Sequence, residues 1–219
     1  MNLLKPDSSG HKCPLCNSSS FFVLLFRKIE YYRCSSCLGV YMHPDFRLSP
    51  KSEKERYETH NNDINDEAYR KFASPLVKQV TGNYQPGSRG LDFGAGTGPV
   101  ASAMLREQGY DMTLYDPFFH NDPASLVKSY DFIICCEVIE HFYNPATEFR
   151  LLRSLLDKKG KLICMTELLM SGTDFADWWY KNDETHVFFY TPESIAWIGA
   201  RFSFDTFIKS SRIVIFTAS

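Results

Sequence analysis

The segment LDFGAGTG, residues 91–98, decides the fold, because a short apolar strand ends there in a turn with three glycines. Glycine has no Cβ atom, so Gly94, Gly96 and Gly98 let the backbone turn sharply and approach a ligand closely. The dinucleotide fingerprint G-x-G-x-x-G has its third glycine one residue later, where this chain has Pro99. The segment predicts a ligand site after the first strand of an α/β sheet.

Strand-like and helix-like segments alternate from Gly87 to the end of the chain. This alternation predicts a mainly parallel sheet with helices on both faces, whose ligands bind beyond the carboxyl ends of the strands. Asn144 and Pro145 predict the start of one helix, and Thr191 with Pro192 the start of another. The expected strands are 89–93, 111–116, 130–136, 161–167, 203–209 and 212–218; the expected helices are 99–108, 145–156 and one beginning at Thr191.

Polar residues follow these strands. Asp116 ends the second strand, about twenty residues after the glycine turn, where a carboxylate accepts both hydroxyls of a ribose in nicotinamide and adenosine binders alike. The segment EVIEHF, residues 137–142, follows the strand YDFIICC. Its two carboxylates and one imidazole indicate either an ordinary loop or a catalytic edge.

Four of the seven cysteines form two C-x2-C pairs, which are separated by seventeen residues. This spacing predicts a four-thiolate tetrahedral zinc site at Cys13, Cys16, Cys34 and Cys37, and residues 21–33 read as a hairpin between two metal knuckles. Two disulfides are the alternative, but a two-residue gap strains such a bridge. Four protein ligands leave no open position on the metal, which favours a structural zinc ribbon.

Three parts of the chain follow: a zinc ribbon at 1–47, connecting helices or a lid at 48–86, and the main domain at 87–219. Apolar residues from Tyr69 to Val80 have helical spacing, and Pro75 predicts either a kink or the start of a second helix. The segment YETHNN, residues 57–62, is interpreted as a lid over a pocket or as a solvated surface.

The composition limits the possible partners. The chain has 219 residues, 44% of them hydrophobic, and a formal net charge of -2, so nucleic-acid binding would need a local basic patch. The sequence has no apolar run of the ~18 residues that a membrane span needs, and its first residues lack the apolar core of a signal peptide. We therefore expect no membrane contact and a cytoplasmic location.

The segments LDFGAGTG, LYDPFF and YDFIICCEVIEHF, in this order and spacing, resemble the motifs of class I S-adenosylmethionine-dependent methyltransferases, over Gly87 to Ser219. With the ribbon, the chain is similar to a bacterial group of zinc-ribbon methyltransferases and to sugar C-methyltransferases with a Glu-His pair after the fourth strand. The resemblance implies a Rossmann-like sheet of seven strands that includes one antiparallel strand. It implies that S-adenosylmethionine contacts Asp92, Gly94, Ala95, Gly96, Gly98, Asp116, Pro117, Phe118 and Glu137.

One departure from this family concerns the edge of the sheet. Only residues 117–129 separate Asp116 from the next strand, too few for the usual helix and third strand with its adenine-binding acid. We expect a trimmed edge, with adenine recognised by stacking on Phe118 or Phe119 and by hydrogen bonds to Asn121 or Asp122.

Two histidines are candidate bases for the acceptor. His141 and His186 follow strands on the ligand side, and histidine suits proton transfer because its pKa of ~6.5 lies near working pH. Glu140 or Glu137 could orient an imidazole. The alternatives are a loop histidine satisfied by the backbone at 141 and a structural one at 186. Trp178, Trp179 and Tyr180 either line an acceptor pocket or pack a lid.

Three functions are therefore open. The first is methyl transfer to an oxygen or carbon of a small molecule, such as a sugar or another metabolite. The second is RNA methylation with the ribbon as the RNA-binding part, since Lys12, Arg27, Lys28 and Arg33 give it a modest positive excess, which four thiolates on one zinc would offset. The third is non-catalytic binding of S-adenosylmethionine. The acceptor and the oligomeric state stay open.

Overall fold

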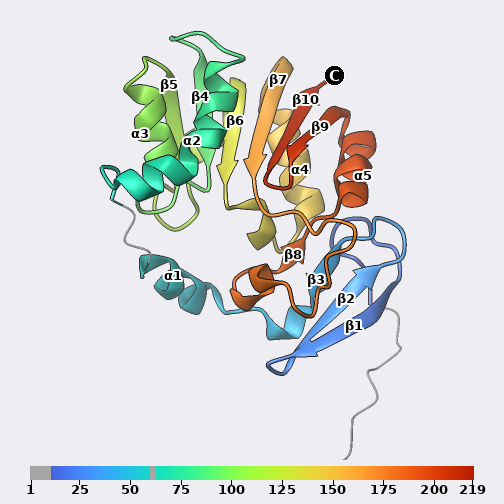
Figure 1. Ribbon diagram of the computed structural model, residues 1–219. Helices are drawn as coiled ribbons and strands as arrows, with labels where there is room; N and C mark the ends of the chain where they lie inside the picture. Colours follow the sequence, from blue (N-terminus) through green and yellow to red (C-terminus); the bar gives the residue numbers. More distant parts are fainter. Residues whose placement is uncertain (1–10, 60–62) are drawn as a thin grey trace, which may run out of the picture.

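The main sheet of the computed structural model, which describes residues 11–59 and 63–219, has six strands in the order β5-β4-β6-β7-β10-β9 (Figure 1). Neighbouring strands are parallel except β10, which runs antiparallel to both β7 and β9. This is the Rossmann-like arrangement with one inserted antiparallel strand that the sequence predicts. The strands are β4 Arg89–Phe93, β5 Asp111–Tyr115, β6 Tyr130–Cys136, β7 Leu156–Met165, β9 Phe204–Ser210 and β10 Ile213–Ala218.

Side chains alternate along each strand, so both faces of this sheet are apolar. Helices cover both faces. Ile134 and Ile163 face one side, where α2 and α3 pack, whereas Ile133 and Leu162 face the other, where α4 and α5 pack. This double burial explains the almost continuous apolar run of β6. The helices are α2 Glu67–Thr81, α3 Val100–Arg106, α4 Pro145–Ser154 and α5 Pro192–Phe202.

The structure confirms the trimmed edge and corrects two details. Between β5 and β6 the chain forms only a 3-10 turn, η2 Pro123–Val127, so β5 is the edge strand. Helix α2 continues through Pro75, and no second helix starts there. Asn144 is the N-cap of α4, but its side chain makes no capping hydrogen bond. Thr191 does cap α5, through a capping box with Ser194.

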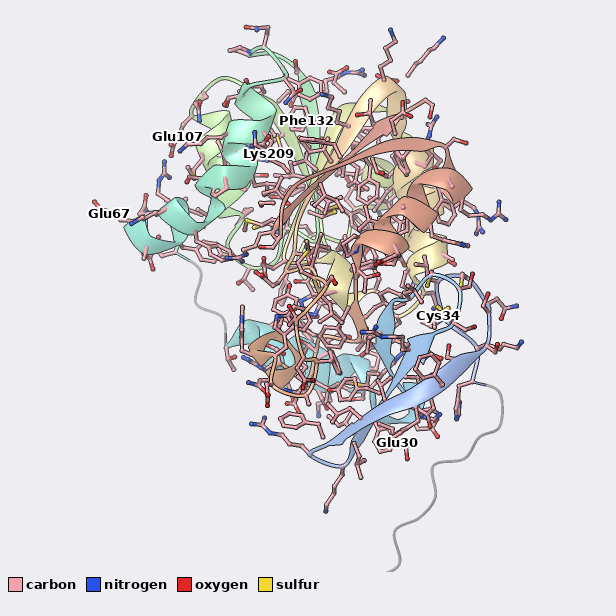
Figure 2. The ribbon with its side chains drawn as sticks, turned by 45° about the vertical axis from the view of Figure 1, so that its right-hand side comes forward. Glu30, Cys34, Glu67, Glu107, Phe132 and Lys209 are labelled. Atoms are coloured by element: carbon pink, nitrogen blue, oxygen red, sulfur yellow. The ribbon has the colours of Figure 1, made fainter. Side chains whose placement is uncertain are left out.

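A second sheet contains the ribbon and one strand from the main domain. Strand β1 (Ser20–Phe26) pairs with β2 (Ile29–Cys34) as the predicted hairpin, followed by β3 (Val40–Met42) and β8 (Phe188–Phe189). The rings of Tyr41 and Phe188 stack at 6.4 Å across the β3–β8 pair. Figure 2 shows Cys34 at the end of the ribbon nearer the main sheet, and the ribbon cysteines share a buried cluster with α4 and α5.

The carboxyl ends of the parallel strands face α1 (Pro50–Glu58), which is capped by Ser49. In Figure 1 the arrowheads of β6 and β7 point toward α1, β8 and the ribbon. Residues His60, Asn61 and Asn62 of the expected lid lie outside the described residues. Short 3-10 turns complete the elements: η1 Pro44–Phe46, η3 Ile139–His141 and η4 Trp179–Asn182. Every helix in the described ranges is too short or too polar to span a bilayer.

We predict that Phe188→Ala destabilises the whole chain, because the ring is fully buried between Tyr41 and Tyr190 and its loss leaves a cavity. The expected loss is about 3–5 kcal/mol in the free energy of unfolding, measured by urea denaturation. Phe207 is 59% exposed, so Phe207→Ala is the matched control and should change stability by less than about 0.5 kcal/mol. Equal effects of the two substitutions would contradict the conclusion that Phe188 of β8 is a buried packing residue between the ribbon and the main domain.

Candidate active site

A cleft of about 900 Å³ opens at the carboxyl ends of β4, β5 and β6. The main sheet contributes its glycine turn and the ends of three strands to the walls. Helix α1 contributes Glu53, Arg56 and Tyr57, and the segment around η4 contributes Trp179, Tyr180 and His186. The cleft therefore combines residues that lie far apart in the sequence, as expected for parallel strands that end at one edge.

The glycine turn needs its glycines for two different reasons. Gly94 has φ +83°, and a Cβ atom there would lie 2.6 Å from Val138, so the turn and the next loop pack directly together. Gly96 has φ +59°, and a Cβ atom there would meet nothing within 4 Å. Open space beside bare backbone allows a ligand to approach the chain closely. The buried Asp92 accepts a hydrogen bond from Ser102 Oγ at 2.6 Å, and burial raises its pKa to about 6.

Asp116 organises this end of the cleft. Its Oδ2 accepts a hydrogen bond from the Gly96 N–H at 3.0 Å, and its Oδ1 accepts from the N–H groups of Phe118 (2.8 Å) and Phe119 (3.1 Å). One buried carboxylate thus fixes both the glycine turn and the segment after β5. Carboxylate oxygens have further lone pairs, so the same group can also accept from a ligand.

The nine residues that the family resemblance assigns to the cofactor all line the cleft. Phe119 also lines it, whereas Asn121 and Asp122 do not, and the Asp122 carboxylate caps its own turn through the Ala124 N–H at 3.0 Å. Of the four residues expected to recognise adenine, only Phe118 and Phe119 therefore line the cleft. The nine are Asp92, Gly94, Ala95, Gly96, Gly98, Asp116, Pro117, Phe118 and Glu137.

Glu137 lies at the exit of β6 in a left-handed conformation, with φ 53°. Its Oε1 accepts from Arg212 at 3.0 Å, and its Oε2 accepts from the Tyr180 hydroxyl at 3.0 Å. Arg212 also pairs with Glu167 at 3.2 Å, so one guanidinium serves two carboxylates. Burial raises the pKa of Glu137, and the neighbouring Glu140 adds to the effect.

Glu140 is fully buried beneath the cleft and is not part of its lining. Its Oε1 accepts from the Tyr180 hydroxyl, while its Oε2 has no hydrogen-bond partner among the described residues. Burial raises the pKa of Glu140 as well. An unpaired oxygen on a buried carboxylate is costly unless another group is bound there.

His141 and His186 lie together, with ring centroids 4.9 Å apart. Nδ1 of His141 is 2.9 Å from the Thr185 carbonyl oxygen, and Nδ1 of His186 is 2.8 Å from the Tyr180 carbonyl oxygen. Because carbonyl oxygens only accept, both Nδ1 atoms carry the proton, and both Nε2 atoms keep a free lone pair in the neutral ring. Burial lowers the pKa of both rings, that of His186 to about 4.

This pair corrects one expectation. Neither Glu137 nor Glu140 orients His141, because the hydrogen bond from its ring goes to the Thr185 carbonyl. The two carboxylates are held by Tyr180 and Arg212 instead. Adjacent residues in the sequence therefore have different hydrogen-bond partners here.

The three aromatic residues of the lid have different environments. Trp178 is buried against Phe175 and Phe189, away from the cleft. Trp179 is 60% exposed and lines the cleft, and Tyr180 is buried and lines it. Both interpretations, packing and pocket lining, therefore apply to this one run.

Several residues of the cleft were not expected from the sequence. Arg56 in α1 pairs with Asp183 at 3.2 Å and so ties α1 to the lid. The Tyr57 ring contacts His141 edge-on at 5.5 Å. Arg212 precedes the last strand and reaches Glu137 across the sheet. The only available signal was their position beside predicted strand ends or in the expected lid.

The four ribbon cysteines place their sulfurs within 4.8 Å of one another. Sγ of Cys13 is 3.7 Å from that of Cys37, and a tetrahedral ion with metal–sulfur distances of about 2.3 Å would hold its sulfurs about 3.8 Å apart. Backbone N–H groups of Ser36 and Cys37 point at Cys34 Sγ, both at 3.4 Å, as they do around a thiolate ligand. These residues could hold a metal ion.

The sheet order, the glycine turn and the acidic residue after the second strand define a class I S-adenosylmethionine-dependent methyltransferase fold. A family model described as "Methyltransferase domain" matches residues 65–206. The chain belongs to this family of methyltransferases.

Solved structures share the fold at low sequence identity. The 1,6-didemethyltoxoflavin-N1-methyltransferase of Burkholderia thailandensis, with 1,6-didemethyltoxoflavin and S-adenosylhomocysteine bound, is 16% identical with a TM-score of 0.53, over 90% of this chain and 97% of that one. An O-methyltransferase family protein of the same organism is 11% identical with a TM-score of 0.52, over 69% and 57%.

The methyltransferase CalO1 of calicheamicin biosynthesis, with S-adenosylhomocysteine bound, is 12% identical with a TM-score of 0.51. The matched region covers 66% of this chain and only about half, 53%, of CalO1. No curated protein sequence matches this chain significantly.

We predict that Asp116→Ala weakens the binding of S-adenosylmethionine, since it removes a ligand acceptor and releases the glycine turn. Each lost charge-assisted hydrogen bond should cost about 1.5–3 kcal/mol, which is roughly a tenfold to hundredfold loss of affinity in calorimetry. Asp157 lies at the opposite end of the sheet, where it pairs with Arg89, and Asp157→Ala is the control. Unchanged affinity of the Asp116 variant would disprove this role.

Proposed function

We propose that this chain transfers the methyl group of S-adenosylmethionine to an oxygen or carbon of a small-molecule acceptor, such as a sugar or another metabolite. The observation that carries the proposal is the shared cleft, whose walls include both the glycine turn and His141 with His186. Its volume of about 900 Å³ is typical of sites for small molecules, with room for a cofactor and a modest acceptor.

Two of the structural neighbours support a small acceptor. The Burkholderia toxoflavin enzyme carries 1,6-didemethyltoxoflavin, and CalO1 acts in the biosynthesis of calicheamicin. The ribbon cations proposed for RNA binding, Lys12, Arg27, Lys28 and Arg33, are absent from the residues that line the cleft. The small-molecule reaction is therefore favoured over RNA methylation.

The cofactor supplies a methyl group on a positively charged sulfur. Asp116, Phe118 and the backbone at Gly94 and Gly96 fit its adenosine and amino-acid parts, because they combine acceptor oxygens, aromatic faces and bare backbone. Methyl transfer from a sulfonium is an in-line displacement that needs alignment and the exclusion of water. Tyr57 and Trp179 close the cleft from the side of α1 and the lid.

His141 promotes loss of the proton from the acceptor. Its Nδ1 donates to the Thr185 carbonyl, so the neutral ring carries its lone pair on Nε2, and the Tyr57 ring contacts it edge-on. Such a preoriented imidazole is suited to act on a hydroxyl or a carbon acid. His186 and Glu140 support the same end of the cleft.

We predict that His141→Asn lowers turnover by about 10²–10⁴-fold, because proton removal loses its promoting group. The affinity for S-adenosylmethionine should stay within about twofold, since no cofactor residue changes. The assay is single-turnover methyl transfer from labelled cofactor on a panel of sugars, phenols and other metabolites, with total RNA as a separate arm.

The panel result also tests the reaction class. Turnover on RNA alone, with a steep dependence on salt, would replace the small-molecule proposal by RNA methylation. Normal turnover of the Asn variant at saturating cofactor would remove His141 from the chemistry. Cofactor binding without turnover on any acceptor would support the non-catalytic alternative.

We further propose that Cys13, Cys16, Cys34 and Cys37 bind one structural zinc ion, which would crosslink the two ends of the β1–β2 hairpin. In this proposal residues 1–47 form the zinc ribbon, residues 48–86 form the connection and lid, and residues 87–219 form the methyltransferase domain. The ribbon strand β3 pairs with β8 of that domain. Four thiolates suit zinc, and the short ribbon has little core of its own.

We predict that Cys16→Ser removes the zinc and lowers thermal stability, because one ligand is lost and the ribbon unfolds. Purified protein should contain about one zinc fewer per chain by elemental analysis. Cys136 lies outside the cluster, so Cys136→Ser should keep the full zinc content. Equal zinc content in both variants would exclude the ribbon site.

A further inference from the structure

A cluster of possible metal ligands, separate from the ribbon, lies where the buried Glu140 meets His141 and His186, which line the end of the cleft that we call the acceptor end. Glu140, His141 and His186 each offer one ligand atom, and these three atoms lie within 4.8 Å of one another. Ligands bound to one ion at ~2.0–2.2 Å must come from such a compact group. Polar residues often lie this close without binding a metal. The hydrogen bonds of each side chain are therefore the evidence for or against a metal site.

Both imidazoles have the hydrogen-bond arrangement that is usual for metal-binding histidines. Metal-binding histidines usually donate their second N–H to a carbonyl or carboxylate, which fixes the ring and leaves the other nitrogen for the ion. His141 donates to the Thr185 carbonyl and His186 donates to the Tyr180 carbonyl, so both Nε2 atoms are the free ones. The ring centroids are 4.9 Å apart, so the two imidazoles are close enough to share one ion.

The Glu140 carboxylate has neither a full set of hydrogen-bond donors nor an ion-pair partner among the described residues. Glu140 is fully buried, and its Oε2 has no hydrogen-bond partner among the described residues. None of the ion pairs within residues 11–59 and 63–219 includes Glu140, because Arg212 is engaged by Glu137 and Glu167. The Tyr180 hydroxyl approaches both Glu137 and Glu140, yet its single proton can serve only one of them at a time. A cation at Oε2 would balance this buried negative charge.

We propose that Glu140, His141 and His186 bind a divalent transition-metal ion at the acceptor end of the cleft. Two imidazoles and one carboxylate suit Zn²⁺, Mn²⁺, Co²⁺ or Fe²⁺, whereas Mg²⁺ and Ca²⁺ prefer oxygen ligands alone. Three protein ligands leave coordination positions open, in contrast to the closed four-thiolate ribbon.

The open positions indicate the acceptor class, and this step depends on the proposed methyltransferase function. An acceptor hydroxyl bound to the ion would lose its proton to water more readily. Its oxygen would form the new bond to the methyl carbon, and the carbon–sulfur bond would break with its electron pair left on sulfur, which would become a neutral thioether. We therefore infer an acceptor with one hydroxyl, or two adjacent hydroxyls, rather than a carbon acid. In this arrangement the Nε2 lone pair of His141 is bound to the ion, so His141 assists proton loss by holding the ion and water takes the proton.

The test is Mn²⁺ binding to the full-length protein with its ribbon zinc retained. Mn²⁺ binds thiolates weakly compared with zinc, so it should report the second site alone. We expect about one bound Mn²⁺ per chain by calorimetry and electron paramagnetic resonance. Glu140→Gln and His186→Gln should each weaken it by more than about tenfold. Glu148 lines the cleft but lies outside the cluster, so Glu148→Gln should bind normally.

A measurement on the unaltered protein covers the case in which a variant fails to fold. Bound Mn²⁺ should broaden the imidazole resonances of two of the six histidines far more than the rest. No saturable binding, or binding that both Gln variants leave unchanged, would overturn the metal site and leave the methyltransferase proposal intact. Conversely, specific metal binding with no methyl transfer to any acceptor would reject the function while the site stands.

Discussion

The backbone of Val187 joins the two parts of this chain. Its N–H donates to the Glu140 carbonyl at 2.9 Å, and its carbonyl accepts from the Met42 N–H at 2.9 Å. Val187 is buried, so each bond is costly to break without a replacement. The loop after β6, the strand β8 and the ribbon strand β3 are therefore held in one register, and His186 is placed beside His141 because it immediately precedes this residue.

The ribbon consequently supports one wall of the cleft. Its cysteine end packs into the same buried cluster as α4 and α5, and its β3 edge holds β8. A metal at the cysteines would stabilise β3, and β3 in turn fixes the segment that carries Tyr180 and His186. A small unit at one end of the sequence thus supports side chains near the other end.

Local chemistry made the main sheet predictable. The apolar runs of β4, β6 and β10, the glycine turn and the Thr191 cap each reflect short-range constraints, and they appear as expected. The strand β8 has only two residues and exists because β3 lies beside it, so no local pattern announces it. Arg212 likewise reaches Glu137 through the antiparallel insertion of β10, a contact that depends on strand order.

Two carboxylates follow the end of β6, and one of them, Glu137, also has a strained backbone. Glu137 has a left-handed backbone that a non-glycine residue adopts at a cost of about 1–3 kcal/mol. It is held there by Arg212 and Tyr180, while Glu140 three residues later is buried and forms no ion pair with another described residue. A core built only for stability would replace such carboxylates by apolar groups. They lie between the glycine turn and two carbonyl-fixed histidines, where the proposed metal ion would balance the charge of Glu140 and would hold an acceptor near the cofactor.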